Sequence, residues 1–245
     1  MKESERVGVI LLWLLVLAPS GCSTISSKPT ELQRTWDAAH LRVVHGNIYA
    51  FGAMSARTNQ LDLAKLPPGL KFPTVIYLHG CAGMDLEKQT ATLRRLLGEG
   101  FAVIAPDSFA LTDRRVVCGR GDRHVFSVRA KEAGYAAEQA RTLAWVDSRN
   151  LFLIGHSEGG AGATAFSGDQ FNAIVISGWG CPDGIASGVP TLALAYSHDH
   201  QIGSKGAICP SATEVVILPG TSHHILQEPE AAERVVGFLN SHLKR

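Results

Sequence analysis

The sequence predicts a single α/β domain, with a mostly parallel sheet and helices on both of its faces. From residue 74 onward, short and nearly continuous apolar runs alternate with longer segments of helical pattern. Such runs are typical of strands covered on both faces, and their alternation with helices is typical of parallel sheets with right-handed crossovers. A chain of 245 residues, 45% of them hydrophobic, is also long enough to bury a sizeable core.

Six apolar runs are the expected strands of the parallel sheet, because each has the length and composition of a buried strand. They lie at 74–78, 101–105, 151–154, 173–176, 191–195 and 214–218. The segment 41–63 is expected to add one or two antiparallel edge strands. Only residues 177–189 separate two of the expected strands, which is too few for an inserted domain, so we expect no lid domain and an open site.

Four segments between the strands have helical patterns, at 86–98, 127–147, 159–167 and 229–243. Ser127 is the expected N-cap of the longest one, in which Ala and Leu recur. The charged residues of this helix are expected on its exposed side. They are Arg129, Lys131, Glu132, Glu138 and Arg141.

The charge balance excludes two classes of protein. With 23 Lys and Arg against 22 Asp and Glu, the formal net charge is +1, and the chain lacks the basic excess of a nucleic-acid-binding protein. It is also too apolar to be disordered. No nucleic-acid partner is therefore expected.

The N-terminal segment 1–21 has the pattern of a secretory signal. Lys2 and Arg6 precede an apolar run at 7–18, which is shorter than the roughly 20 residues of a membrane-spanning helix. Cys22, directly after Ser20 and Gly21, resembles the cysteine of the lipobox of bacterial lipoproteins, although Pro19 stands where the lipobox usually has Leu. An ordinary cleaved signal is the alternative.

The resemblance to lipoproteins implies export, with a lipid anchor (palmitate or a similar acyl chain) on Cys22 and the domain in the periplasm or at the cell surface. Residues 22–40 are then the expected tether, and 41–245 the expected domain. Apart from Cys22, four cysteines remain, and in an oxidising compartment they permit two disulfides. Their pairing stays open among three connectivities of Cys81, Cys118, Cys181 and Cys209.

The most informative motif is G-x-S-x-G at 155–159, placed after an apolar strand and before a segment rich in Ala and Gly. A serine nucleophile needs a tight turn between strand and helix, and flanking glycines remove the Cβ clashes of such a turn. The motif therefore predicts Ser157 as a nucleophile. An ordinary turn serine is the alternative interpretation.

A serine hydroxyl becomes nucleophilic when a histidine takes its proton and an acid orients that histidine. Asp199 follows the strand at 191–195 and is the expected acid, with Asp183 in reserve; Asp107 comes too early in the chain. His223 follows the last strand and is the expected base, with His224 as its competitor. The histidines at 198, 200, 223 and 224 lack the spacing of a helical zinc motif, so neither a metal nor a cofactor is expected.

The oxyanion hole is expected to use the backbone N–H groups of Glu158 and Cys81, since Cys81 lies in a glycine-flanked loop after the first parallel strand. His79 and His156 are more consistent with structural hydrogen bonding than with catalysis.

These residues resemble the α/β-hydrolase fold and, within it, the dienelactone hydrolase family. The resemblance rests on 78–83, 106–109, 155–160, Asp199 and 220–223, and extends over residues 74–243. It implies a triad of Ser157, His223 and Asp199 that hydrolyses an ester or lactone through an acyl-enzyme. The founding dienelactone hydrolases use cysteine as the nucleophile, and this chain has Ser157 there.

Four arginines of the segment 106–126 are candidates for binding a carboxylate of the substrate, and a solvated basic loop is the alternative. They are Arg114, Arg115, Arg120 and Arg123. Trp179 is expected to line the pocket or to pack.

We therefore expect a serine esterase or lactonase acting on a small molecule. Two alternatives remain: a peptidase or acyltransferase with the same triad, and a non-catalytic envelope protein that uses the fold for binding. The oligomeric state stays open.

Overall fold

The computed structural model describes residues 30–84, 90–114, 118, 122–202 and 208–245. The predicted signal segment 1–21 and the predicted lipidation residue Cys22 lie outside this part of the chain. The helices of the described part are α1 (Glu31–Asp37), α2 (Arg57–Leu63), α3 (Thr90–Gly98), α4 (Arg123–Arg141), α5 (Glu158–Ala165) and α6 (Pro229–Ser241).

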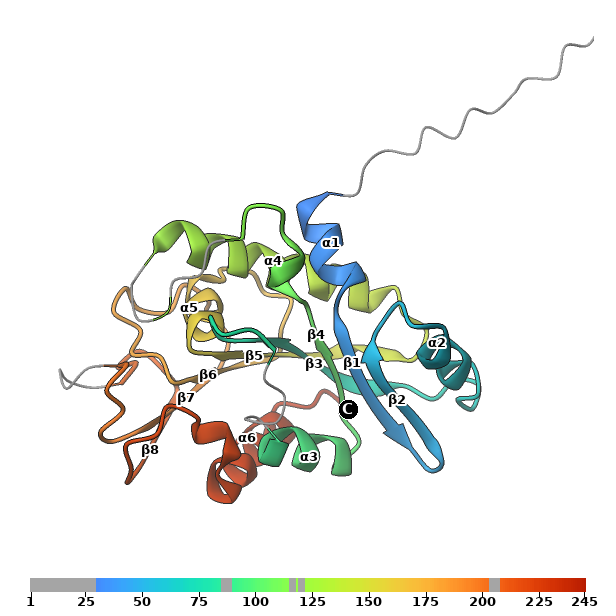
Figure 1. The fold of residues 1–245 in the computed structure, drawn as a ribbon. Coiled ribbons are helices and arrows are strands. Elements are labelled where there is room, and N and C mark those ends of the chain that lie inside the picture. The colour runs from blue at the N-terminus through green and yellow to red at the C-terminus, as the bar shows by residue number, and fades with distance from the viewer. Residues whose placement is uncertain (1–29, 85–89, 115–117, 119–121, 203–207) are drawn as a thin grey trace, which may run out of the picture.

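The predicted mostly parallel sheet is confirmed. Its eight strands run in the order β2-β1-β4-β3-β5-β6-β7-β8 across the described residues (Figure 1). β1 is antiparallel to both β2 and β4, as expected for an N-terminal edge, and the neighbours from β4 to β8 pair in parallel. The strands are β1 (His40–His45), β2 (Ile48–Ala53), β3 (Phe72–Leu78), β4 (Ala102–Ala105), β5 (Val146–His156), β6 (Ala173–Ser177), β7 (Thr191–Tyr196) and β8 (Glu214–Leu218).

Helices cover both faces of this sheet, as predicted. Successive strand residues point to opposite faces, so Ile76 and Leu78 of β3 join the core under α4 and α5, whereas Val75 and Tyr77 join the core over α3 and α6. Figure 1 shows these two helix layers on either side of the strands. Both faces of the central strands are therefore buried, which explains why the sequences of these strands are continuous apolar runs.

Helix α4 differs from its prediction. Asp122, not Ser127, caps it: the Asp122 carboxylate accepts from the His124 N–H at 2.9 Å. The helix ends at Arg141, because the chain then turns tightly into β5 at Val146. Arg129 and Glu132, expected on the exposed side, are both 1% exposed.

The predicted tether is also shorter than expected. Thr30 caps α1 by accepting from the Gln33 N–H at 3.1 Å, and β1 already begins at His40. The Thr35 carbonyl accepts from the N–H of Asp107 at 3.0 Å, which ties α1 to the end of β4. Residues 31–40 are therefore part of the domain, because this helix packs on it.

No helix intervenes between β6 and β7, where residues 178–190 form a loop that the structure describes completely. The edge of the sheet where the parallel strands end is thus not covered by an inserted domain at this point.

Candidate active site

Ser157 stands on the tight turn between β5 and α5. Its backbone has φ 55° and ψ −116°, a conformation that non-glycine residues rarely adopt and that is held here by a 2.8 Å bond from its N–H to the Ser177 carbonyl. The flanking glycines are needed. A Cβ on Gly155 would overlap the Gly159 carbonyl oxygen, and one on Gly159 would overlap the Leu78 carbonyl oxygen.

His223 and Asp199 form a hydrogen-bonded pair beside this turn. The Nδ1 of His223 lies 2.7 Å from Oδ2 of Asp199, and the two side chains are 10% and 2% exposed. The other carboxylate oxygen of Asp199 accepts from the Gln201 N–H at 2.9 Å. A carboxylate fixed in this way orients the imidazole and keeps its proton on Nδ1, which leaves Nε2 as the basic nitrogen.

The His223 ring and the backbone of Ser157 both contact the chain at the end of β6. A Cβ on Gly178 would lie 3.0 Å from Cε1 of His223, so the ring packs directly on this glycine, and the preceding residue, Ser177, accepts the N–H of Ser157. Nε2 of His223 is buried and has no hydrogen-bond partner in the described part of the chain. In serine hydrolases, the hydrogen bond between the histidine Nε2 and the serine hydroxyl is often formed only when substrate is present.

The reserve acid Asp183, and Asp107, which comes too early in the chain, have other partners. Asp183 lies 2.8 Å from Arg123 in an ion pair whose side chains are 61% and 85% exposed. Asp107 caps the short helix η2 (Ser108–Ala110) by accepting from the Phe109 N–H at 2.9 Å. Of the three candidate acids, Asp199 is the one that contacts the expected base, His223.

A second buried imidazole lies against the first. The ring centroid of His156 is 4.9 Å from that of His223 and 5.4 Å from that of His224, and its Nδ1 shares a 3.1 Å hydrogen bond with the Ser177 hydroxyl. Burial, followed by the charges of His223 and His224, lowers the pKa of His156 to about 3. The His156 imidazole is therefore neutral, and it packs beside His223 at the site, in line with the expected structural role.

The expected oxyanion loop, residues 79–83, follows β3. A disulfide joins Cys81 to Cys118, and a second one joins Cys181 to Cys209, so the structure selects one of the three possible connectivities. The Gly80 carbonyl accepts from the Gly83 N–H at 3.1 Å. A Cβ on Gly80 would lie 3.3 Å from Cβ of Ser157, which places this loop directly over the nucleophile turn.

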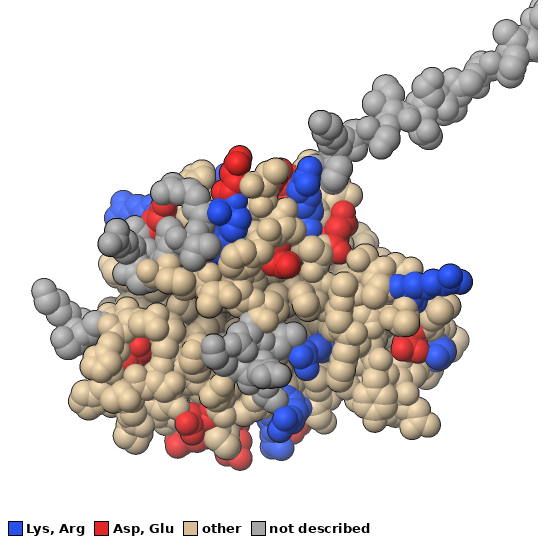
Figure 2. Space-filling model, viewed as in Figure 1, with Lys and Arg blue, Asp and Glu red and all other residues tan. Residues whose placement is uncertain are grey.

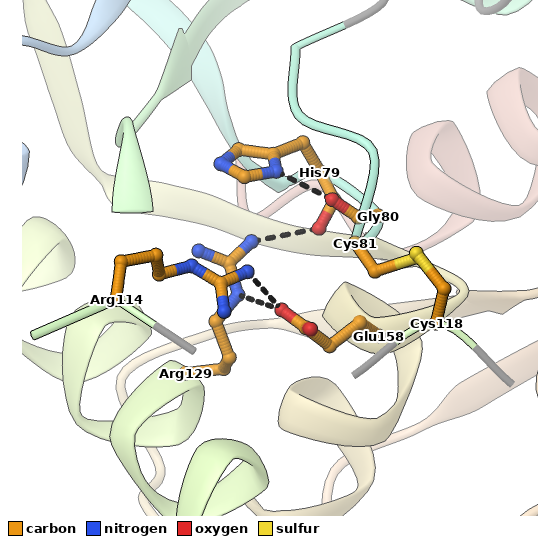
Figure 3. Close-up of a disulfide and its surroundings, with 7 residues drawn as sticks. All are labelled: His79, Gly80, Cys81, Arg114, Cys118, Arg129 and Glu158. Carbon is orange, nitrogen blue, oxygen red and sulfur yellow. Dashed lines mark hydrogen bonds and ion pairs between the residues drawn. A yellow bond between two sulfur atoms is a disulfide. The ribbon is translucent and has the colours of Figure 1, made fainter. Parts of the chain in front are cut away.

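The four candidate arginines fall into different places. The Arg114 guanidinium is turned inward: its side chain is 7% exposed and lies 2.5 Å from Glu158 (Figure 3). This position does not suit the expected role of binding a substrate carboxylate. Arg115 and Arg120 lie outside the described residues, and Arg123 is exposed.

A groove of about 410 Å³ lies between α4, α5 and the loop after β6. Ala161 and Thr164 line it, and they stand one and two helical turns beyond Ser157 on the same face of α5. Trp179, next to Gly178, lines the same wall and packs edge-on against Phe126 with centroids 5.1 Å apart. The exposed pair of Arg123 and Asp183 forms its rim.

Side chains of both charge signs lie on the face of the described part that Figure 2 shows. On the face seen in Figure 2, basic and acidic side chains occur beside one another around α1 and α4. Within the described ranges, no group of three or more potential metal ligands occurs, and no helix combines the length and apolarity needed to cross a membrane.

Solved structures share this fold. A Klebsiella pneumoniae protein assigned as a dienelactone hydrolase matches with a TM-score of 0.50 and 20% identity, covering 73% of this chain and 88% of its own. A cold-adapted esterase from an Arctic intertidal metagenomic library matches with a TM-score of 0.55 and 15% identity, covering 73% and 86%. The esterase PE8 matches at 0.50 and 16%, covering 73% and 97%.

The chain has the fold of these α/β hydrolases. No protein-family model matches the sequence, and neither does any curated protein. At these identities the likeness establishes the fold, and the chemistry must be argued from this chain's own residues.

Proposed function

We propose that this protein is a serine hydrolase that cleaves a carboxylic ester or lactone through an acyl-enzyme. The observation that carries the proposal is the 2.7 Å bond between His223 and Asp199, placed next to a serine on a strained strand-to-helix turn. These three residue types in this order and geometry are what covalent acyl transfer requires.

In the proposed reaction, Nε2 of His223 takes the hydroxyl proton of Ser157 while Oγ attacks the carbonyl carbon. The N–H groups of Glu158 and Cys81 stabilise the oxyanion. Collapse of the tetrahedral intermediate expels the alcohol oxygen, which takes the proton from His223. Water then attacks the acyl-enzyme, with His223 again as the base, and releases the acid and free Ser157.

The groove between α4, α5 and the loop after β6 is the proposed site for the non-scissile part of the substrate. Its walls mix apolar side chains, such as Phe126 and Trp179, with polar ones, such as Thr164, and its rim is charged. This mixture suits a small or medium-sized ester with an apolar arm better than a highly charged one.

Labelling with a fluorophosphonate tests the nucleophile. The purified protein should be labelled at Ser157, and the Ser157→Ala variant should not be. Labelling that persists in Ser157→Ala, or its absence in the wild type, contradicts the proposal. A panel of p-nitrophenyl esters, lactones and peptides then separates ester hydrolysis from peptidase or transferase chemistry.

Export and lipid attachment at Cys22 remain part of the proposal. Two disulfides within the domain support an oxidising compartment, since such bonds are rare in the reducing cytosol. Mass spectrometry of the mature protein from cells, beside Cys22→Ala, tests it. An unmodified N-terminus would contradict lipidation.

A further inference from the structure

Four charged side chains form a buried ion cluster under the oxyanion loop: Arg114, Arg129, Glu132 and Glu158. Figure 3 shows three of them, Arg114, Arg129 and Glu158. Arg129 pairs with Glu132, and its Nε lies 3.7 Å from Glu158, which also pairs with Arg114 at 2.5 Å. All four side chains are less than a tenth exposed. Two cations thus balance two carboxylates in a place where an unpaired charge would be costly.

Arg129 connects this cluster to the oxyanion loop. Its second terminal nitrogen donates to the backbone carbonyl of His79 at 2.8 Å. The first nitrogen is held by Glu132, so the guanidinium has a fixed direction. The peptide between His79 and Gly80 is therefore anchored by a buried, charge-assisted bond.

The next peptide is anchored by the His79 ring. Nε2 of His79 accepts from the Ser108 N–H at 3.2 Å, which places the ring proton on Nδ1, and Nδ1 donates to the Gly80 carbonyl at 2.7 Å. Burial, followed by the charge of Arg129, lowers the pKa of His79 well below its ordinary value, so the ring carries a single proton.

The carbonyl of Gly80 and the N–H of Cys81 belong to one planar trans peptide and point in opposite directions. Bonds that hold and polarise this carbonyl therefore aim the Cys81 N–H and strengthen it as a donor. The side chain of Glu158, whose own N–H is the other expected donor, pairs with Arg114 and lies near Arg129, so both donors are held by a common set of contacts.

We propose that Arg129 is a positioning residue of the oxyanion hole, acting through the His79 carbonyl and held in place by Glu132 and Glu158. This inference rests on the proposed function. It assigns to a residue of α4, outside the triad and its strand ends, a share of transition-state stabilisation.

The test compares Arg129→Lys and Arg129→Met with the wild type on p-nitrophenyl acetate. Because the oxyanion is absent from the bound substrate and forms only on the way to the tetrahedral intermediate, kcat should fall roughly 10- to 100-fold, and KM should change less than about threefold. Inhibition by a trifluoromethyl ketone, which forms the oxyanion on Ser157, should weaken in parallel with kcat/KM.

A second variant guards against loss of folding. Arg129→Met leaves Glu132 and Glu158 with reduced compensation, so the double variant R129M/E132Q removes one charge of each sign and keeps the balance. It should unfold cooperatively and still show the kcat loss. Lys131→Met removes an exposed cation from the same helix and should leave kcat and inhibition unchanged.

The outcomes are separable. If the folded double variant and Arg129→Lys both keep wild-type kcat and ketone affinity, the positioning role is wrong while the proposed hydrolase stands. The positioning role is equally wrong if KM rises with kcat unchanged. A wild type that hydrolyses no ester and binds no ketone would overturn the proposed function, and the positioning role with it.

Discussion

The Nδ1 atom of His223 lies 2.7 Å from Oδ2 of Asp199, and this bond joins the loops that follow β7 and β8. The two residues lie 24 positions apart in the chain. They meet because β7 and β8, the strands that precede their loops, are neighbours in the sheet. The ring of His223 packs on Gly178, next to the residue whose carbonyl accepts the Ser157 N–H.

The first prediction concerns that carboxylate. Asp199→Asn should lower kcat on the order of 10³- to 10⁴-fold, because an amide no longer selects the tautomer with a basic Nε2. Asp183→Asn changes the reserve acid, whose partner is Arg123. Ester hydrolysis by both variants checks the assignment, and it is wrong if Asp183→Asn, rather than Asp199→Asn, abolishes turnover.

The second prediction concerns Gly178, which has φ +62° and lies against two imidazoles. In Gly178→Ala, a Cβ would meet His223 Cε1 at 3.0 Å and His156 Cε1 at 3.2 Å. Displacing the base in this way should reduce kcat about 100-fold. Gly188→Ala, in the same loop but with open space around it, is the control and should retain activity. Equal activity of the two variants would contradict this packing.

The third prediction separates the two disulfides. Cys118→Ser and Cys209→Ser open loops of 37 and 28 residues, so each should lower the unfolding free energy by up to about 4 kcal/mol. Only Cys118→Ser frees the oxyanion loop, and it should lower kcat. Cys209→Ser loosens the wall at Trp179 and should mainly raise KM for long acyl esters. Identical kinetic changes in both variants would show that stability alone is responsible.

The fourth prediction follows from the lowered pKa of His156, about 3 in the folded protein against an ordinary 6.5. Above pH 6.5 both folded and unfolded forms are neutral and the residue has no effect. Below it, only the unfolded chain binds the proton, so stability falls with falling pH by up to about 1.4 kcal/mol per unit until about pH 3.

Urea unfolding between pH 7 and 4 measures this slope. His156→Asn should flatten it, whereas exchange of the exposed His198 for Asn should leave it as in the wild type. A slope that is the same in His156→Asn would mean that this imidazole does not stay neutral.

The fifth prediction tests the groove with Ala165→Phe, which places a ring in the groove from an exposed position on α5. Hydrolysis of octanoyl esters should fall about tenfold in kcat/KM, and that of acetyl esters should change little, because only the longer chain reaches the filled space. An equal loss on both substrates would place the acyl arm elsewhere.

Much of the fold was accessible from the sequence because parallel strands have a strong signal. The apolar runs and the glycines at 155 and 159 predict the strand and the turn that the structure contains, since here a local backbone requirement dictates the residue type. The positions of Asp199 and His223 after later strands could likewise be predicted from the order of residues along the chain, without knowledge of the packing.

The ion cluster was not predicted, because burial of Arg129 and Glu132 depends on partners far away in the chain. A helix surface rich in charges ordinarily faces water. A signal was nevertheless present: positions 129, 132, 133, 136 and 140 lie on one face of a helix whose other members on this face are buried alanines. Two opposite charges three residues apart on such a face are typical of a buried ion pair.

The turn at residue 157 obtains its shape from Gly155, Gly159 and a backbone bond to Ser177, none of which involves the serine side chain. The position of residue 157 therefore does not depend on which reactive group its side chain carries. The backbone fixes Cβ of residue 157 in space, so replacing the γ oxygen that it carries with sulfur is a chemical change that the fold permits without rearrangement.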